Sequence, residues 1–300
     1  MDILVIGATG AVGTCLVPAL IAAGHTVHGS ARTPDKASQL ESQGARAVTV
    51  DVFATDSVTR AIEASRAQAV INVATHVPAL GRAPLPWAWT SHHRLRRDAS
   101  HVIAHAALAA GTDVLIQEAT SLGYADAGAQ WITEASPLRP RGPVATVPHA
   151  QAAAAVMSRA GKRGITLMFG KFYGEDVMTR EKYHAVRRGT PVLLGSPHDW
   201  VPMTHVESAA SAVVAALDAP SGIYNVNDAP VTKAEIADQY SRVAGRETRF
   251  YPQFLMVLSA GAEVYGRSQR VSTALFEDTA SWRPRVTSFA DSFAEVAERW

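Results

Sequence analysis

Residues 3–13 read ILVIGATGAVG, an apolar run followed by a turn with three regularly spaced glycines. The run 3–6 predicts a buried strand, and apolar residues at helical spacing from 12 to 23 predict a helix directly after it. Glycines between a strand and a helix let a pyrophosphate approach the backbone at the helix N-terminus. We therefore predict a dinucleotide-binding turn, the alternative being a tight turn without a ligand. The residues assigned to it are Gly7, Thr9, Gly10, Ala11, Val12 and Gly13.

The first half of the chain alternates short apolar runs with helical patterns. The other predicted strands are 26–30, 47–50, 69–73, 114–117 and 165–169. Such runs are typical of parallel strands buried on both faces, so the expected fold class is α/β, a doubly wound parallel Rossmann sheet. Beyond Gly170 the pattern is irregular, with helices expected near 206–218, 233–243 and 289–300. We place an NADP-binding Rossmann domain at 1–168 and a smaller, mixed substrate-binding lobe at 169–300, over the carboxyl ends of the strands.

Composition excludes several classes of partner. Lys plus Arg total 28 and Asp plus Glu total 27, so no excess of charge favours a nucleic acid or an anionic membrane. No apolar run is long enough to span a bilayer, no basic leader is recognisable, and Cys15 has no second cysteine to pair with, so a cytoplasmic location is expected. We expect a small-molecule substrate and no metal site, and a homodimer is left open.

The end of the second predicted strand bears on the choice of nucleotide. Ser30 and Arg32 stand where an NAD site usually has an acidic residue for the ribose 2′-hydroxyl. A guanidinium binds a phosphate in bidentate geometry. These two residues therefore favour NADP over NAD, the alternative being that Arg32 is a solvated surface charge.

With these features, the chain resembles the extended short-chain dehydrogenase/reductase superfamily, often called the NAD-dependent epimerase/dehydratase family. The resemblance runs over nearly the whole chain and includes the glycine turn and the segments 51–52, 72–76, 119–124, 169–174, 204–209 and 224–226. It implies that Asp51 and Val52 lie beside the adenine and that Ala74 and Thr75 contact the cofactor after strand four. It also implies that residues 169–174 open the substrate loop.

The chain departs from the family at the residues that carry its chemistry. Members use a Ser or Thr at the end of strand five, together with a Tyr and a Lys spaced YxxxK on one helix face. None of the seven tyrosines here is followed by Lys four residues later. An ungapped count puts Ala145 and His149 in the two slots, whereas a two-residue insertion puts Val147 and Gln151 there. Loss of a positioned general acid costs about 10²–10⁴ in rate, so we expect little ordinary ketone reduction.

Several other side chains are candidates for the chemistry. Thr120 keeps the hydroxyl position of the family, and His149 carries an imidazole that titrates near neutrality. The full set of catalytic candidates is Thr120, Ser121, His149, His76 and Tyr173, each of which also has a purely structural interpretation. For the substrate we single out Tyr124, Lys171 as a group for an anion or carbonyl, and Trp87 as an apolar wall. The charge run 92–97 is expected to be a solvated face.

Three functions stay open. The first is an atypical NADP(H)-dependent oxidoreductase with a substituted proton donor, acting on a small organic carbonyl compound of bulky, aromatic or polyketide-like character. The second keeps the fold but performs isomerisation, cyclisation, dehydration or aldol chemistry. The third is a non-catalytic NADP-sensing protein. The intact glycine turn favours an enzyme, and redox chemistry is placed first, although the fold alone does not decide.

Overall fold

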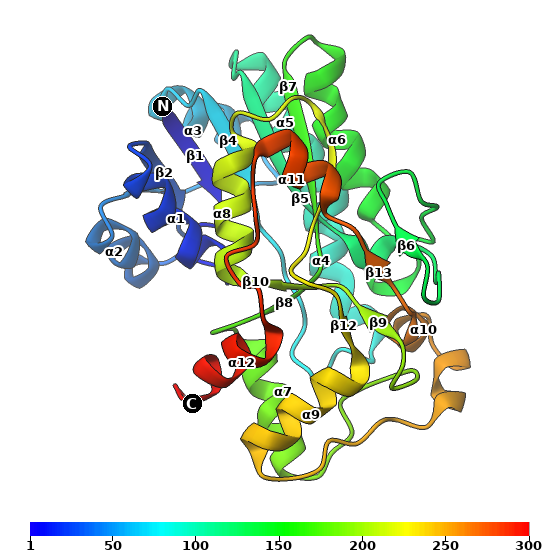
Figure 1. Cartoon of the computed structure of the whole chain (residues 1–300). Coiled ribbons are helices and arrows are strands. Elements are labelled where there is room, and N and C mark those ends of the chain that lie inside the picture. The colour runs from blue at the N-terminus through cyan, green and yellow to red at the C-terminus, as the bar shows by residue number, and fades with distance from the viewer. Residues whose placement is uncertain (300) are drawn as a thin grey trace.

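The computed structural model describes residues 1–299 and places seven strands in one sheet (Figure 1). The strand order is β11-β7-β5-β4-β1-β2-β3, and every neighbouring pair is parallel. These strands are β1 Asp2–Ile6, β2 Thr26–Ser30, β3 Arg46–Val48, β4 Ala69–Asn72, β5 Val114–Thr120, β7 Arg163–Phe169 and β11 Gly222–Val226. The predicted doubly wound Rossmann sheet is therefore confirmed.

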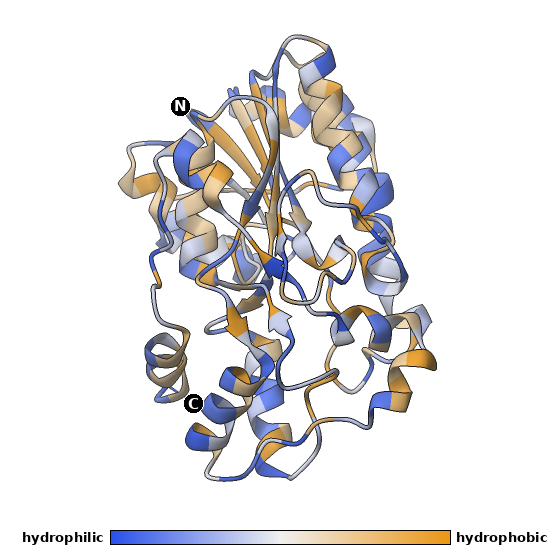
Figure 2. Cartoon of the chain, turned by 45° about the vertical axis from the view of Figure 1, so that its right-hand side comes forward, coloured by the Kyte–Doolittle hydropathy of each residue, from blue (hydrophilic) through white to orange (hydrophobic). Residues whose placement is uncertain are grey.

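Helices cover both faces of the sheet because alternate strand residues point to opposite sides. Ile116 of β5 packs with α1 (Gly13–Ala22) and α8 (Val206–Ala216). Leu115 packs on the other face, with α3 (Thr55–Ser65), α5 (Ser100–Ala109) and α6 (Val147–Arg159). The helix α2 (Pro34–Ser42) lies against β3. Figure 2 shows hydrophobic residues along the central strands, between these helical layers.

A smaller lobe lies against the carboxyl ends of the strands (Figure 1). Its helices are α7 Val177–Arg187, α9 Lys233–Ala244, α10 Ala260–Gly266 and α12 Phe289–Ala297. Short strand pairs link it to the sheet: β8 Lys171–Tyr173 with β10 Met203–His205, β9 Trp200–Val201 with β12 Val231–Thr232, and β6 Trp131–Ile132 with β13 Arg270–Val271. Two further helices are α4 Thr90–Arg94, joined to α5 by the π-helical turn Leu95–Ala99, and α11 Ala274–Ala280, which packs beside β11.

The expected boundary at residue 168 does not separate sheet from lobe. β11 pairs with β7 along its whole length, from Gly222 opposite Ile165 to Val226 opposite Phe169, and α8 packs on α1. The sheet therefore takes a strand and a helix from the range 169–300. This edge strand escaped prediction because its sequence, GIYNV, mixes polar and apolar residues.

Residues 1–299 contain neither a membrane-spanning helix nor a cluster of metal ligands. None of the helices in this range combines the length and the apolar character needed to cross a bilayer. Within the same range, no group of three or more His, Cys, Asp or Glu side chains is arranged to hold a metal ion.

Candidate functional site

The glycine turn packs so closely that two of its positions exclude a side chain. A Cβ on Gly13 would lie 2.3 Å from the carbonyl oxygen of Gly7. A Cβ on Gly7, whose φ is +89°, would lie 2.7 Å from the backbone nitrogen of Ala74, just after β4. The Gly10 N–H donates to the Gly7 carbonyl at 3.0 Å and closes the turn. The N-terminus of α1 is thereby held against the ends of β1 and β4.

This turn fits the diphosphate of a dinucleotide. The N–H groups of Ala11 and Val12 have no hydrogen-bond partner among residues 1–299, and Ala11 is exposed. Free N–H groups at the positive end of a helix suit a phosphate. The Ser30 hydroxyl accepts the Gly7 N–H at 3.0 Å, so β2 also supports the turn. Arg32 is exposed and forms no ion pair in the described part of the chain.

The segment predicted to lie beside the adenine is a local turn after β3. The Asp51 carboxylate accepts the Phe53 N–H at 3.0 Å, and the Asp51 N–H donates to the Ser57 hydroxyl at 3.0 Å. Val52 packs partly against the α3–α5 side of the core. Arg94 of α4 lies 4.5 Å from the centre of the Phe53 ring. These contacts hold the turn in place, and a role in adenine binding stays a prediction.

The segment after β4 is tied to the sheet and then crosses to the lobe. The Asn72 side chain accepts the Ala74 N–H at 3.2 Å and donates to Gln117 of β5 at 2.9 Å. Thr75 and His76 are exposed. Farther along, the Leu80 N–H donates to the carboxylate of Glu181 on α7 at 2.6 Å. This loop, which also carries the exposed Trp87, therefore bridges sheet and lobe.

Two hydroxyls at the end of β5 have different environments. Thr120 is 9% exposed, and its hydroxyl accepts the Leu122 N–H at 3.4 Å, which leaves its own proton available. Ser121 is fully buried, and its hydroxyl donates to the Phe169 carbonyl and to Asn227, both at 3.2 Å. The Ser121 proton is thus held inside the core, and the catalytic role of Ser121 stays a prediction. Thr120 is the hydroxyl of this pair that a ligand can reach.

Two tyrosines predicted at the site are core residues instead. The buried Tyr124 donates its hydroxyl proton to Asn225 at 2.9 Å, and burial raises the pKa of its phenol above the ordinary value. Tyr173 is equally buried, with its hydroxyl 3.2 Å from that of Ser292 and its ring edge-on to His205, and burial raises its pKa as well. The structure thus shows both phenols in core hydrogen bonds, and the substrate role of Tyr124 and the catalytic role of Tyr173 stay predictions.

The residues that the two alignments put in the Lys position, His149 and Gln151, point from different faces of α6. His149 is exposed, and its ring lies edge-on to that of His101 on α5, with the centroids 6.2 Å apart. Val147 is buried, and the Gln151 amide lies 3.5 Å from the sulfur of Met168 on β7. His149 therefore faces α5 while the other register faces β7. A catalytic role for His149 stays a prediction.

A buried ion pair beneath the end of β5 was not predicted. Arg96, in the π-helical turn before α5, pairs with Glu118 of β5, and the two side chains are 4% and 3% exposed. The Arg96 Nε donates to one carboxylate oxygen at 3.3 Å, and its Nη2 contacts the other. Glu118 shares a strand face with Thr120, two residues later. The pair therefore anchors the strand end that presents the Thr120 hydroxyl.

His92 completes this buried cluster. It is 2% exposed, and within residues 1–299 neither ring nitrogen has a hydrogen-bond partner. Burial, and then the nearby charge of Arg96, lower its pKa well below the ordinary value. The expectation that the run 92–97 is a solvated face is thus wrong at these two residues. Their spacing of four places them on one helix face, which is the signal that was available in the sequence.

Lys171 lies near the same end of the sheet. It starts β8 two residues after Phe169, which pairs with Thr120 between β7 and β5. Its amine lies beside that of Lys182 on α7, and burial is the main cause that lowers the pKa of both. A substrate role for Lys171 stays a prediction.

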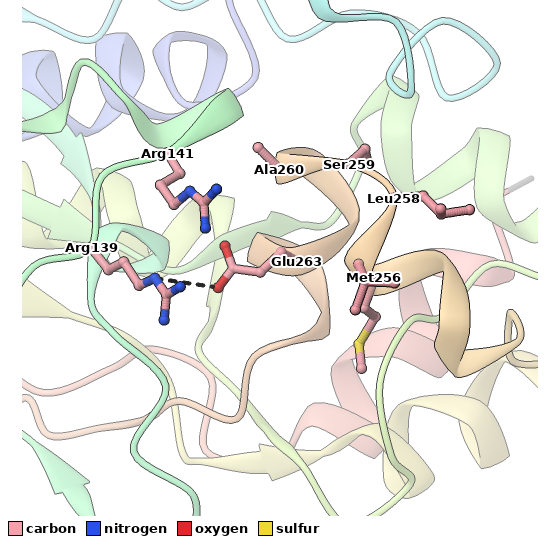
Figure 3. Close-up of a pocket in the computed structure, with 8 residues that line it drawn as sticks. Arg139, Arg141, Met256, Leu258, Ser259, Ala260 and Glu263 are labelled. Carbon is pink, nitrogen blue, oxygen red and sulfur yellow. Dashed lines mark ion pairs between the residues drawn. The ribbon is translucent and has the colours of Figure 1, made fainter.

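Two cavities are lined by residues outside the predicted site. One, of about 470 Å³, is lined by the basic residues Arg139 and Arg141 and by residues 256–260 and Glu263, which run from the end of the 3₁₀ turn Gln253–Val257 into α10 (Figure 3). Arg139 lies 3.8 Å from Glu263, which also pairs with Arg267 at 2.8 Å. The second, of about 330 Å³, lies between Trp131 and the segment 284–287. Neither cavity is lined by a residue predicted to bind cofactor or substrate.

Known proteins resemble the chain in sequence and in fold. The model of the NAD dependent epimerase/dehydratase family matches residues 3–227. A 3-diazoavenalumate denitrifying reductase from a Streptomyces species is 30% identical over 258 residues, which cover 82% of each chain. The UDP-glucose 4-epimerase of Thermus thermophilus, solved with NAD, superposes with a TM-score of 0.79 at 20% identity, covering 99% of this chain and 98% of that one. A human epimerase family protein, solved with NADPH, gives 0.77 at 21% identity over 100% of both chains. This chain belongs to the NAD dependent epimerase/dehydratase family.

Proposed function

We propose that the protein is an NADPH-dependent reductase whose acceptor takes up a hydride without a proton, an arenediazonium compound being the chemical class that fits best. The observation that carries the proposal is that the chain keeps the nucleotide-binding turn of its family but lacks the family's proton donor. The nucleotide turn has the packing and the free N–H groups of a binding turn. The helix face that should supply the proton donor carries Ala145 and His149, or Val147 and Gln151 in the other register.

This contrast is expected if the acceptor needs no acid. Reduction of a ketone requires a hydride at carbon and a proton at oxygen, so it depends on a positioned donor. A bound NADPH would supply a hydride that forms the new C–H bond of an arenediazonium ion as the carbon–nitrogen bond breaks and N₂ leaves, with no proton taken up. The Streptomyces relative bears a name that describes removal of nitrogen from a diazo compound by a reductase.

The residues of this chain then have binding and orienting roles. The glycine turn holds the pyrophosphate, and Arg32 at the end of β2 takes the ribose 2′-phosphate, which favours NADPH. Thr120 keeps a free hydroxyl proton at the carboxyl edge of β5 and orients the acceptor there. Trp87, exposed in the loop that bridges sheet and lobe, supplies an apolar surface for an aromatic ring.

Isotope transfer tests the proposal directly. The protein is incubated with 4-carboxybenzenediazonium and with NADPH deuterated at either the pro-R or the pro-S position of C4. We expect benzoate that carries deuterium at the carbon that held nitrogen, from one of the two cofactors and not from the other. Evolution of N₂ should match NADPH consumption.

Two controls separate enzyme catalysis from the background reaction. A reaction without protein reports uncatalysed reduction, and Gly13→Val removes the cofactor turn because no Cβ fits there. Label arriving from both cofactors at the uncatalysed rate would refute the proposal. So would brisk NADPH consumption with simple ketones, since it would show that a proton donor is present.

A further inference from the structure

Two lysines meet next to the edge of the sheet where the proposed chemistry takes place. Lys171 follows Phe169 by two residues, about 7 Å of extended chain, and Phe169 pairs directly with Thr120. Lys182 projects from α7 and is 6% exposed. The two amines are neighbours. The loop from β4 reaches the same place, because Leu80 is hydrogen-bonded to Glu181, next to Lys182 in the chain.

Neither lysine has an acidic partner. No ion pair in residues 1–299 involves Lys171 or Lys182, whereas Lys233 pairs with Asp199 at 3.0 Å and also donates to two backbone carbonyls. Asp176 is the acid with an electrostatic effect on both amines. Its carboxylate already accepts the N–H of Thr179 at 3.0 Å and the hydroxyl of the same residue. The structure therefore brings the buried Lys182 and the partly exposed Lys171 together, with no carboxylate paired to either among residues 1–299.

A pair of neighbouring lysines without an acidic partner, one of them buried, calls for an anionic ligand. Adjacent ammonium groups in a medium of low dielectric repel each other, and the cost falls when an anion lies between them. A carboxylate has two oxygens for the two amines, each in a charge-assisted hydrogen bond. We propose that Lys171 and Lys182 bind the carboxylate group of the substrate, which makes the substrate an aromatic acid.

The strand order argues that this anion is part of the substrate and not of the nucleotide. The glycine turn and Arg32 lie at β1 and β2, whereas β8 continues from β7, which is separated from β1 by β5 and β4. Three strand spacings amount to about 14 Å. The proposal rests on the proposed function for the identity of the acid, while the anion site follows from the lysines alone.

Anion binding at this pair has a signature of its own. Burial lowers the pKa of both amines, and the nearby charge of Lys171 lowers that of Lys182 further. The contact with Lys182 raises the pKa of Lys171, and Asp176 raises the pKa of both. Each amine therefore loses its proton more easily than an ordinary lysine, and a bound carboxylate favours the charged form of both. Binding should be accompanied by proton uptake.

Calorimetry of the full chain loaded with NADP⁺ tests this inference, with cinnamate and methyl cinnamate as probes. The acid should bind at least about tenfold more tightly than the ester. Titrations of the acid at pH 8 in HEPES and in Tris should give different apparent enthalpies, as proton uptake requires. Lys171→Met and Lys182→Met should each weaken cinnamate binding at least about tenfold and leave the ester unaffected. Lys162→Met, which removes a half-exposed lysine paired with Asp113, should leave both ligands unaffected.

Several outcomes would overturn the inference. Equal affinity for acid and ester, or no binding of either, would do so in the wild type, without any variant. Undiminished cinnamate binding in both lysine variants would do so as well. The proposed function is tested separately, since isotope transfer to a diazonium ion that has an ester in place of its carboxylate would support the reductase and contradict the carboxylate site. Cinnamate binding that depends on the lysines, without any isotope transfer, would support the carboxylate site and contradict the proposed reductase.

Discussion

Breaking the Arg96–Glu118 pair should destabilise the protein more than any change on its surface. Both side chains are almost completely buried, at 4% and 3% exposed. Glu118→Gln keeps the shape of the side chain but leaves the guanidinium without a negative partner. Removing one partner of a buried pair typically costs about 3–5 kcal/mol. In a chain of this size that corresponds to a fall in Tm on the order of 5–10 °C.

The assay is urea unfolding followed by tryptophan fluorescence, for Glu118→Gln, Arg96→Met and the double variant. The double variant removes both charges, so its loss of unfolding free energy should be clearly smaller than the sum of the two single losses. Arg97→Met is the matched control, because Arg97 pairs with Asp98 on the surface, where the two side chains are 51% and 42% exposed. Its urea midpoint should not move.

Thr120 gives the same variants a functional readout. It lies two residues beyond Glu118 on the same strand, so a displaced strand end should lower kcat while nucleotide affinity at the glycine turn is retained. The reasoning would be refuted if Glu118→Gln lost less than about 1 kcal/mol of unfolding free energy. Strict additivity of the two single variants would refute it as well.

Further variants test the cofactor, the proton donor and a buried acid. Arg32→Ala should weaken NADPH binding at least about tenfold without changing NADH binding, in a fluorescence titration; equal affinity of the wild type for both nucleotides would contradict the assignment. His149→Gln should keep kcat for an arenediazonium substrate within a few-fold, since the proposed reaction needs no proton; a loss of about tenfold or more would identify His149 as a proton donor. Burial raises the pKa of Asp228 to about 6, above its ordinary 3.8. The folded state therefore binds this proton more tightly, so stability should rise as the pH falls from about 6 towards 4. Asp228→Asn should flatten the dependence of Tm on pH between about 6 and 4. An unchanged dependence would show that Asp228 is not its origin.

The cofactor turn could be predicted because its requirements are local. Gly13 is needed by packing within one strand–turn–helix unit and Gly7 by its positive φ, and that unit can be recognised in eleven consecutive residues, 3–13. The sheet could be predicted for a similar reason, since each strand buried on both faces is a short apolar run. β5 extends to Thr120, three residues beyond its predicted end, because its last residues are polar and yet buried.

The buried polar residues could not be assigned in the same way, because their partners lie far away in the chain. Tyr124 bonds to Asn225, and Ser121 to Asn227, each more than 100 residues away. A tyrosine or serine beside a predicted active site suits catalysis and core hydrogen bonding equally well, and the fold decides between them.

The packing of α8 on α1 has a consequence for synthesis on the ribosome. Leu16 and Leu20 of α1 are covered in part by a helix that begins at residue 206, and the edge of β7 stays open until β11, ending at residue 226, has emerged. At ordinary translation rates roughly 10–40 s separate α1 from α8. During that interval the nascent chain exposes an apolar helix stripe, and later an unpaired strand edge. Both are surfaces that chaperones bind, so the yield of folded protein should depend on how long translation takes between these two helices.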